Sequence, residues 1–85
     1  MKINKVVIEE FAQEKILNHG LKIEEVENGI FFGKPKISKD RYGRYVAITN
    51  CNRYITIVFE YDDSNANVIT AYPSSDWQIR RYKRK

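Results

Sequence analysis

The sequence of 85 residues is poor in several residue types, and each shortage excludes a class of protein. Its one cysteine, Cys51, cannot form an internal disulfide and has no second cysteine with which to build a zinc site. There is no HExxH motif, no phosphate-binding glycine loop and no serine in a nucleophile elbow. Acidic residues occur as adjacent pairs whose side chains diverge, so these pairs predict solvated surfaces. We therefore predict no metal site and no other cofactor.

Long hydrophobic runs are also missing. No apolar run approaches the roughly 20 residues that span a membrane, and residues 1–10 alternate charged residues with short apolar clusters, unlike a signal peptide. The expected location is therefore the cytoplasm, with no membrane partner. With 42% hydrophobic and 13% aromatic residues, the chain is too apolar to be disordered. Its length suits a single domain over residues 1–85, with little room for a deep pocket.

Charges of opposite sign are concentrated in different parts of the chain. Residues 1–30 contain four lysines and six glutamates, a net charge of −2. Residues 31–85 contain eleven lysines and arginines and five acids, a net charge of +6, and together the two parts make the net charge of +4. The basic part is expected to meet phosphate, an acidic protein, or both.

Two helices are predicted in the first third of the chain. Apolar residues recur every three and four positions from Ile8 to His19, which is the spacing of a helix with one buried face. A shorter helix is predicted from Lys22 to Asn28, with Gly29 as its stop.

Beyond Gly33 the apolar period changes to two, which predicts strands. Three runs rich in β-branched and aromatic residues, at 45–49, 54–61 and 67–72, are each bounded by turn residues. Residues 34–38 are a candidate edge strand, which Pro35 disfavours.

A final helix is predicted from Ser75, because Ser75 and Gln78 have the spacing of a capping box. The elements together predict an α+β fold: two N-terminal helices packed on an antiparallel sheet of three to four strands, with a C-terminal helix.

His19 is the single histidine of the chain. It lies four residues after Lys15 and eight after Phe11, so on a helix the three side chains stack along one ridge. Imidazole titrates near neutral pH, which makes proton transfer one explanation for His19. The other is that a histidine before Gly20 only caps the helix end.

Cations and aromatics make up the remaining candidate site. Arginine matches the geometry of phosphate and tyrosine rings can stack on unpaired bases, so this mixture favours single-stranded RNA over a small neutral substrate. The alternative is that the cations solvate a sheet edge and the tyrosines complete the core. The candidates are Lys15, His19, Arg44, Arg53, Tyr54, Tyr72, Arg80, Arg81 and Tyr82.

The order of these residues resembles that of the BrnT-like toxin family. The resemblance runs from about Val7 to Lys83, and an arginine usual in the family is replaced here by Tyr72. The segments that carry it are Phe11-x3-Lys15-x3-His19-Gly20, Glu24-Glu25-Val26, Gly43-Arg44-Tyr45-Val46-Ala47-Ile48, Asn52-Arg53-Tyr54-Ile55, Val68-Ile69-Thr70-Ala71 and Arg81-Tyr82.

The resemblance implies a RelE-like ribonuclease fold and the toxin component of a type II toxin–antitoxin pair. Such a toxin is a metal-independent endoribonuclease that is neutralised by a cognate antitoxin, as part of a homo- or hetero-oligomer. RNA is then cleaved by attack of a 2′-hydroxyl on the adjacent phosphate. Arg44 and Arg53 are assigned to phosphate stabilisation, and His19 or Lys15 to proton transfer. Tyr54, Tyr72 and Tyr82, with Arg80 and Arg81, are assigned to RNA binding.

Two other functions fit the same residues. One is a catalytically inactive RNA-binding or antitoxin-binding module of this fold, which the loss of a cation at Tyr72 favours. The other is a structural protein-interaction domain that uses an exposed sheet edge.

Overall fold

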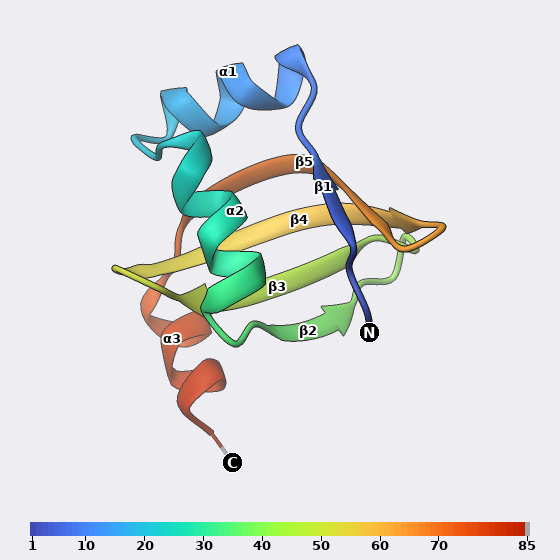
Figure 1. Cartoon of the computed structure of the whole chain (residues 1–85). Helices are drawn as coiled ribbons and strands as arrows, with labels where there is room; N and C mark the ends of the chain where they lie inside the picture. Colours follow the sequence, from blue (N-terminus) through green and yellow to red (C-terminus); the bar gives the residue numbers. More distant parts are fainter. Residues whose placement is uncertain (85) are drawn as a thin grey trace.

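Over residues 1–84, the computed structural model has three helices and a five-stranded sheet (Figure 1). In chain order the elements are β1 (Lys5–Val7), α1 (Glu10–Asn18), α2 (Ile23–Phe32), β2 (Lys36–Lys39), β3 (Tyr45–Asn50), β4 (Tyr54–Asp62), β5 (Asn65–Pro73) and α3 (Asp76–Lys83). The sheet order is β1-β5-β4-β3-β2, with β1 parallel to β5 and all other pairs antiparallel. The predicted α+β class, with two N-terminal helices and a C-terminal helix, is confirmed.

The sheet has five strands because β1 and β2 extend the three central ones. β1 was not predicted, since three residues are too few to show an alternating pattern, and it pairs with residues 65–67 far along the chain. The candidate edge strand is present as β2, and it begins at Lys36, just after Pro35.

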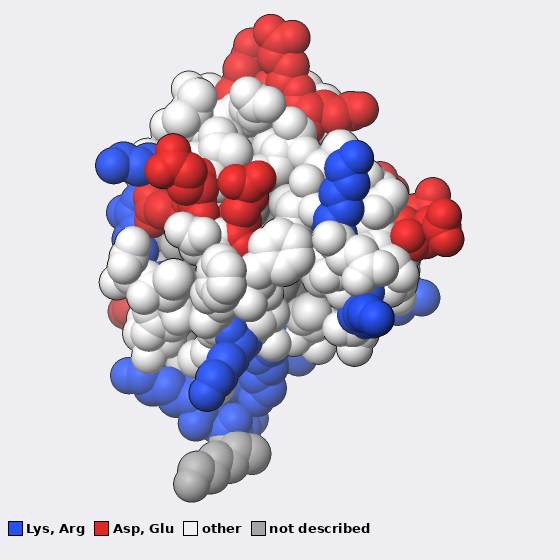
Figure 2. Space-filling view, viewed as in Figure 1, with Lys and Arg blue, Asp and Glu red and all other residues white. Residues whose placement is uncertain are grey.

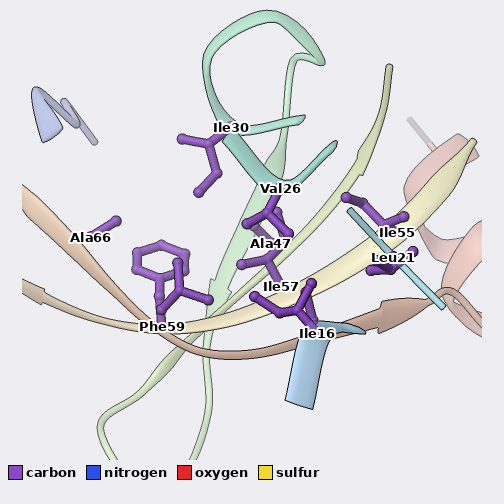
Figure 3. Close-up of a cluster of buried hydrophobic side chains, with 11 residues drawn as sticks. Ile16, Leu21, Val26, Ile30, Ala47, Ile55, Ile57, Phe59 and Ala66 are labelled. Atoms are coloured by element: carbon purple, nitrogen blue, oxygen red, sulfur yellow. The ribbon is translucent and has the colours of Figure 1, made fainter. Parts of the chain in front are cut away.

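Helices α1 and α2 cover one face of the sheet, and this face holds the core. Ile55, Ile57 and Phe59 of β4 are buried on it, in the alternation that the sequence predicts. Figure 3 shows Ile16 of α1 and Val26 of α2 among these side chains.

Helix α2 continues past the stop expected at Gly29. The structure places Gly29 against β3, where a Cβ atom would lie 2.7 Å from Cγ2 of Thr49, and Thr49 Oγ1 donates a hydrogen bond of 2.7 Å to the Gly29 carbonyl. This glycine therefore permits close packing between helix and sheet and does not end the helix. The chain leaves the helix at Gly33 and Lys34, where φ of Lys34 is 52°.

Helix α3 lies on the opposite face of the sheet, at the end where β4 begins and β5 ends (Figure 1). Gln78 is its buried residue and hydrogen-bonds to Thr56 of β4. Lys36 of β2 holds the far end of the helix, since its Nζ donates to the carbonyls of Arg81 and Arg84 at 3.1 and 2.9 Å.

Within residues 1–84, no helix has the length and apolar character needed to span a membrane.

Candidate functional site

The end of α1 is set by a glycine, as the sequence predicts, and this places His19. Gly20 has φ of 81°, and the N–H of Leu21 reaches back to the carbonyl of Ile16 at 3.1 Å. These are the features of a Schellman motif, in which His19 is the C-cap residue. Leu21 and Ile16 are both buried in the core, so the helix end is anchored while the His19 side chain is exposed.

His19 lies against Tyr72 of β5. Their ring centroids are 6.1 Å apart with a tilt of 55°. The Tyr72 hydroxyl oxygen accepts a hydrogen bond of 3.2 Å from Nε2 of Gln78. Its own proton is therefore available to an acceptor outside the protein.

Gln78 joins α3 to this end of the sheet through both ends of its amide. Its Oε1 accepts from Thr56 Oγ1 at 3.0 Å and from the backbone N–H of Ser75 at 2.9 Å, and its Nε2 donates to Tyr72. Ser74 Oγ lies 2.8 Å from the same threonine oxygen. The bond from Ser75 to Gln78 is one of the two that the predicted capping box requires. At 4% exposure, Gln78 fixes the position of Tyr72 relative to the helix.

Arg53 clamps the turn between β3 and β4 to the helical pair. Its Nε and Nη2 donate to the two carboxylate oxygens of Glu25 at 2.8 and 3.0 Å, and Nη2 also donates to the Gly20 carbonyl at 2.8 Å. These hydrogen bonds hold the pKa of Glu25 below its ordinary value of 4.5, and the carboxylate raises the pKa of Arg53. Arg53 therefore reaches the carbonyl of Gly20, the residue after His19, but most of its hydrogen-bonding capacity holds the fold together.

Arg44 lies at the other end of the same strand pair. Tyr45 pairs with Phe59 at the start of β3, whereas Asn50 pairs with Tyr54 at its end. The six residues of β3 therefore separate Arg44 from Arg53 by about 20 Å. The sequence-based prediction that Arg44 contacts the same phosphate as Arg53 and His19 is therefore wrong, because Arg44 lies too far away.

Lys15 is on the predicted ridge of α1, but its side chain turns toward the start of the helix. Its Nζ lies 5.8 Å from the ring centroid of Phe11, which is 51% exposed. Long side chains on a helix point toward its N-terminus, so Lys15 is directed away from His19.

Tyr54 and Tyr82 form an edge-to-face pair where α3 crosses the sheet. Their ring centroids are 5.6 Å apart, and Nζ of Lys83 lies 5.6 Å from the Tyr54 ring centroid. The Tyr82 hydroxyl donates to the carbonyls of Gly33 and Lys34, at 3.2 and 3.1 Å. Tyr82 therefore docks α3 onto the end of α2, while Tyr54 and Lys83 present a ring and a cation side by side. The sequence-based candidates did not include Lys83. Its position directly after Tyr82, in a run of basic residues, could have indicated that it belongs to the same surface.

Arg80 and Arg81 are exposed, whereas Gln78 and Tyr82 of the same helix make its contacts with the sheet and with the end of α2. Figure 2 shows basic residues gathered at the lower end of the molecule, where Figure 1 places α3, and acidic residues gathered mainly at the opposite end around α1 and the start of α2. The charge difference between the two parts of the sequence therefore becomes a difference between two ends of the folded domain.

The fold and this end of the molecule define an α+β domain with a cationic, tyrosine-bearing surface. Among residues 1–84, no group of three or more His, Cys, Asp or Glu side chains is arranged to hold a metal ion. No protein-family model, no curated protein and no solved structure matches the chain. The resemblance to BrnT-like toxins therefore stays a prediction from the sequence.

Proposed function

We propose that this protein binds single-stranded RNA on the surface formed by α3 and the adjoining end of the sheet. The observation that carries the proposal is the placement of Lys83 next to the half-buried Tyr54 ring, on the helix that also carries exposed arginines. A cation next to an aromatic ring can bind the phosphate of a nucleotide while the ring stacks on the base of the same nucleotide.

Unpaired RNA fits this surface better than a duplex. Bases in a single strand are free to stack on aromatic side chains, whereas a double helix hides the faces of its bases. The arginines at this end can form paired hydrogen bonds to phosphate oxygens, and their charges attract the backbone before contact.

The test is binding of a fluorescently labelled 15-nucleotide RNA, measured by anisotropy at increasing salt. We expect affinity to fall as salt rises, with a logarithmic slope of about −2 for three phosphate contacts on a single strand. Lys83→Glu is expected to weaken binding about 10-fold or more. Lys39→Glu is the matched control, because Nζ of Lys39 lies 5.7 Å from the Tyr45 ring at the other end of the sheet. Equal losses for the two variants, or no binding by the wild type, would refute the proposal.

A second candidate, favoured by the contact between His19 and Tyr72, is the endoribonuclease toxin that the family resemblance implies. In that reaction the 2′-oxygen attacks the adjacent phosphorus, the 5′-oxygen departs, and a 2′,3′-cyclic phosphate forms. His19 would accept the proton of the 2′-hydroxyl, and the departing oxygen would take its proton from water. Tyr72 would keep its proton and donate a hydrogen bond from its hydroxyl to an oxygen of the phosphorane.

Cleavage is tested on the purified protein with labelled RNA in the presence of a chelator. His19→Ala and Tyr72→Phe are each expected to lower the rate about 100-fold, and Arg44→Ala is the control that leaves it unchanged. If the wild type retains RNA without yielding fragments, even after any bound partner is removed, only the binding function stands. A cleaving toxin would be neutralised by a cognate antitoxin, so addition of that protein should stop fragment formation.

A further inference from the structure

Helix α3 has two faces of different character. Its inner face packs against the sheet through Gln78 and Tyr82. The outer face carries Trp77, Arg80, Arg81 and Arg84, at the spacing i, i+3, i+4 and i+7 that places side chains along one side of a helix. These four residues line a shallow hollow of about 430 Å³.

Folding does not explain Trp77. The residue is 56% exposed, although tryptophan is the side chain with the most apolar area to bury. The docking of α3 is carried by the inner face, so removing the indole would leave those contacts in place. An exposed ring among cations is typical of a binding surface.

The three arginines around Trp77 are available to a ligand. Over residues 1–84 the ion pair between Arg53 and Glu25 is the only one within 4.0 Å, so no carboxylate of these residues lies within that distance of Arg80, Arg81 or Arg84. Three guanidinium groups around one indole supply phosphate contacts on either side of a stacking surface.

Hydrogen bonds between α3 and the rest of the fold also fix the position of its outer face. Nζ of Lys36 binds the carbonyls of Arg81 and Arg84, and Gln78 and Tyr82 tie the inner face to the sheet and to the end of α2. A rigid helix presents its side chains with less loss of conformational freedom on binding than a loop does.

We propose that this hollow is a nucleotide-binding subsite, in which an unpaired base stacks on the Trp77 indole while Arg80, Arg81 and Arg84 hold its flanking phosphates. This subsite rests on the proposed RNA-binding function and lies next to the Tyr54 and Lys83 pair, because Lys83 follows Arg80 by three residues on α3. A single strand is therefore expected to contact the hollow beside Trp77 and the Tyr54 and Lys83 pair at the same time.

The only tryptophan of the chain makes the subsite directly observable. Titration of the full-length protein with a ten-nucleotide oligouridylate is expected to quench the fluorescence of Trp77 in a saturable manner. An abasic oligonucleotide of the same length carries the same phosphates without bases, and it should bind more weakly with little quenching. Trp77→Leu should weaken oligouridylate binding, measured by anisotropy, by about 5-fold to 100-fold, the range that loss of one stacked base gives.

Phe11→Leu is the matched control, since Phe11 is a similarly exposed aromatic residue on α1 and should leave binding unchanged. If oligouridylate binds but the emission of Trp77 stays constant and Trp77→Leu binds as tightly as the wild type, the subsite is refuted and the proposed function stands. If no oligonucleotide binds by anisotropy, the proposed function itself fails.

Equal quenching by the abasic strand would show a phosphate site without base stacking. Quenching only by vesicles of phosphatidylserine and phosphatidylcholine would show a membrane-docking surface. Either of these last two results overturns the subsite.

Discussion

The two ends of the β3–β4 strand pair differ in what surrounds an arginine. At one end Arg53 bridges the strand turn to α2 and to the α1–α2 loop, and its side chain is 47% exposed beside a Glu25 that is 17% exposed. At the other end Arg44 follows an open turn in which Asp40 Oδ1 accepts the backbone N–H groups of Tyr42 and Arg44, at 2.8 and 2.9 Å. The side chain of Arg44 is exposed. Two arginines at corresponding positions of two strands therefore have different roles, one in stability and one on a solvated surface.

Gln78→Ala is expected to lower the stability of the protein most, because Gln78 joins α3 to the end of the sheet at which Arg53 lies. The change removes one of the two partners of the buried Thr56 hydroxyl, removes the donor to the Tyr72 hydroxyl and opens a small cavity, so the free energy of unfolding should fall by about 2 kcal/mol. Urea denaturation followed by circular dichroism measures it. Gln13→Ala is the control, because the amide of Gln13 makes one exposed bond to the Ile8 carbonyl and should cost less than about 0.5 kcal/mol. Equal losses would mean that α3 is held by other contacts.

A smaller effect is expected from Arg53→Ala, and it tests the comparison directly. Loss of the bonds to Glu25 and Gly20 should lower the midpoint of thermal unfolding, by less than Gln78→Ala does because the guanidinium is exposed to solvent. Arg44→Ala should stay within about 0.5 kcal/mol of the wild type. The two variants are compared by thermal unfolding at one salt concentration. A larger loss for Arg44→Ala would reverse the assignment of roles.

The smallest effect is a dependence on pH that Glu25 should impose. Its pKa is lowered in the folded state, chiefly by the hydrogen bonds from Arg53, so its stabilising contribution is present above the unfolded pKa and is lost as pH falls through the folded one. The difference in unfolding free energy between the wild type and Glu25→Gln should therefore be greatest above pH 5 and should shrink as pH falls below 4.5. Urea titrations from pH 7 to about pH 3 measure this difference. A constant difference over that range would contradict the ion pair.

Local patterns in the sequence were sufficient for most of the secondary structure. The apolar spacing of α1, the alternation of β4 and the polar cap of α3 each depend on neighbours within a few positions along the chain. Gly29 shows where this reasoning fails, because its role depends on Thr49, which lies 20 residues away. A glycine needed for close packing and a glycine that ends a helix look alike in sequence.

The candidate site was predicted only in part, because contacts between residues far apart along the chain do not show in local patterns. The end of α1, the β3–β4 turn, β4, β5 and α3 each contribute one residue to one end of the sheet: His19, Arg53, Tyr54, Tyr72 and Tyr82. Arg44 and Arg53 looked equivalent because each lies next to a predicted strand. An antiparallel connection sends successive strand starts to opposite ends of the sheet, so that equivalence could not hold in space.

By itself, the sequence determined the α+β class, the two N-terminal helices, the central strands, the final helix and the concentration of positive charge after residue 30, because these depend on local periodicity and composition. Only the tertiary structure decided that β1 joins β5, that Arg53 is bound to Glu25 and that Trp77 stands among three arginines on the free side of α3. Those three outcomes depend on which faces pack together, and packing joins residues that are distant along the chain.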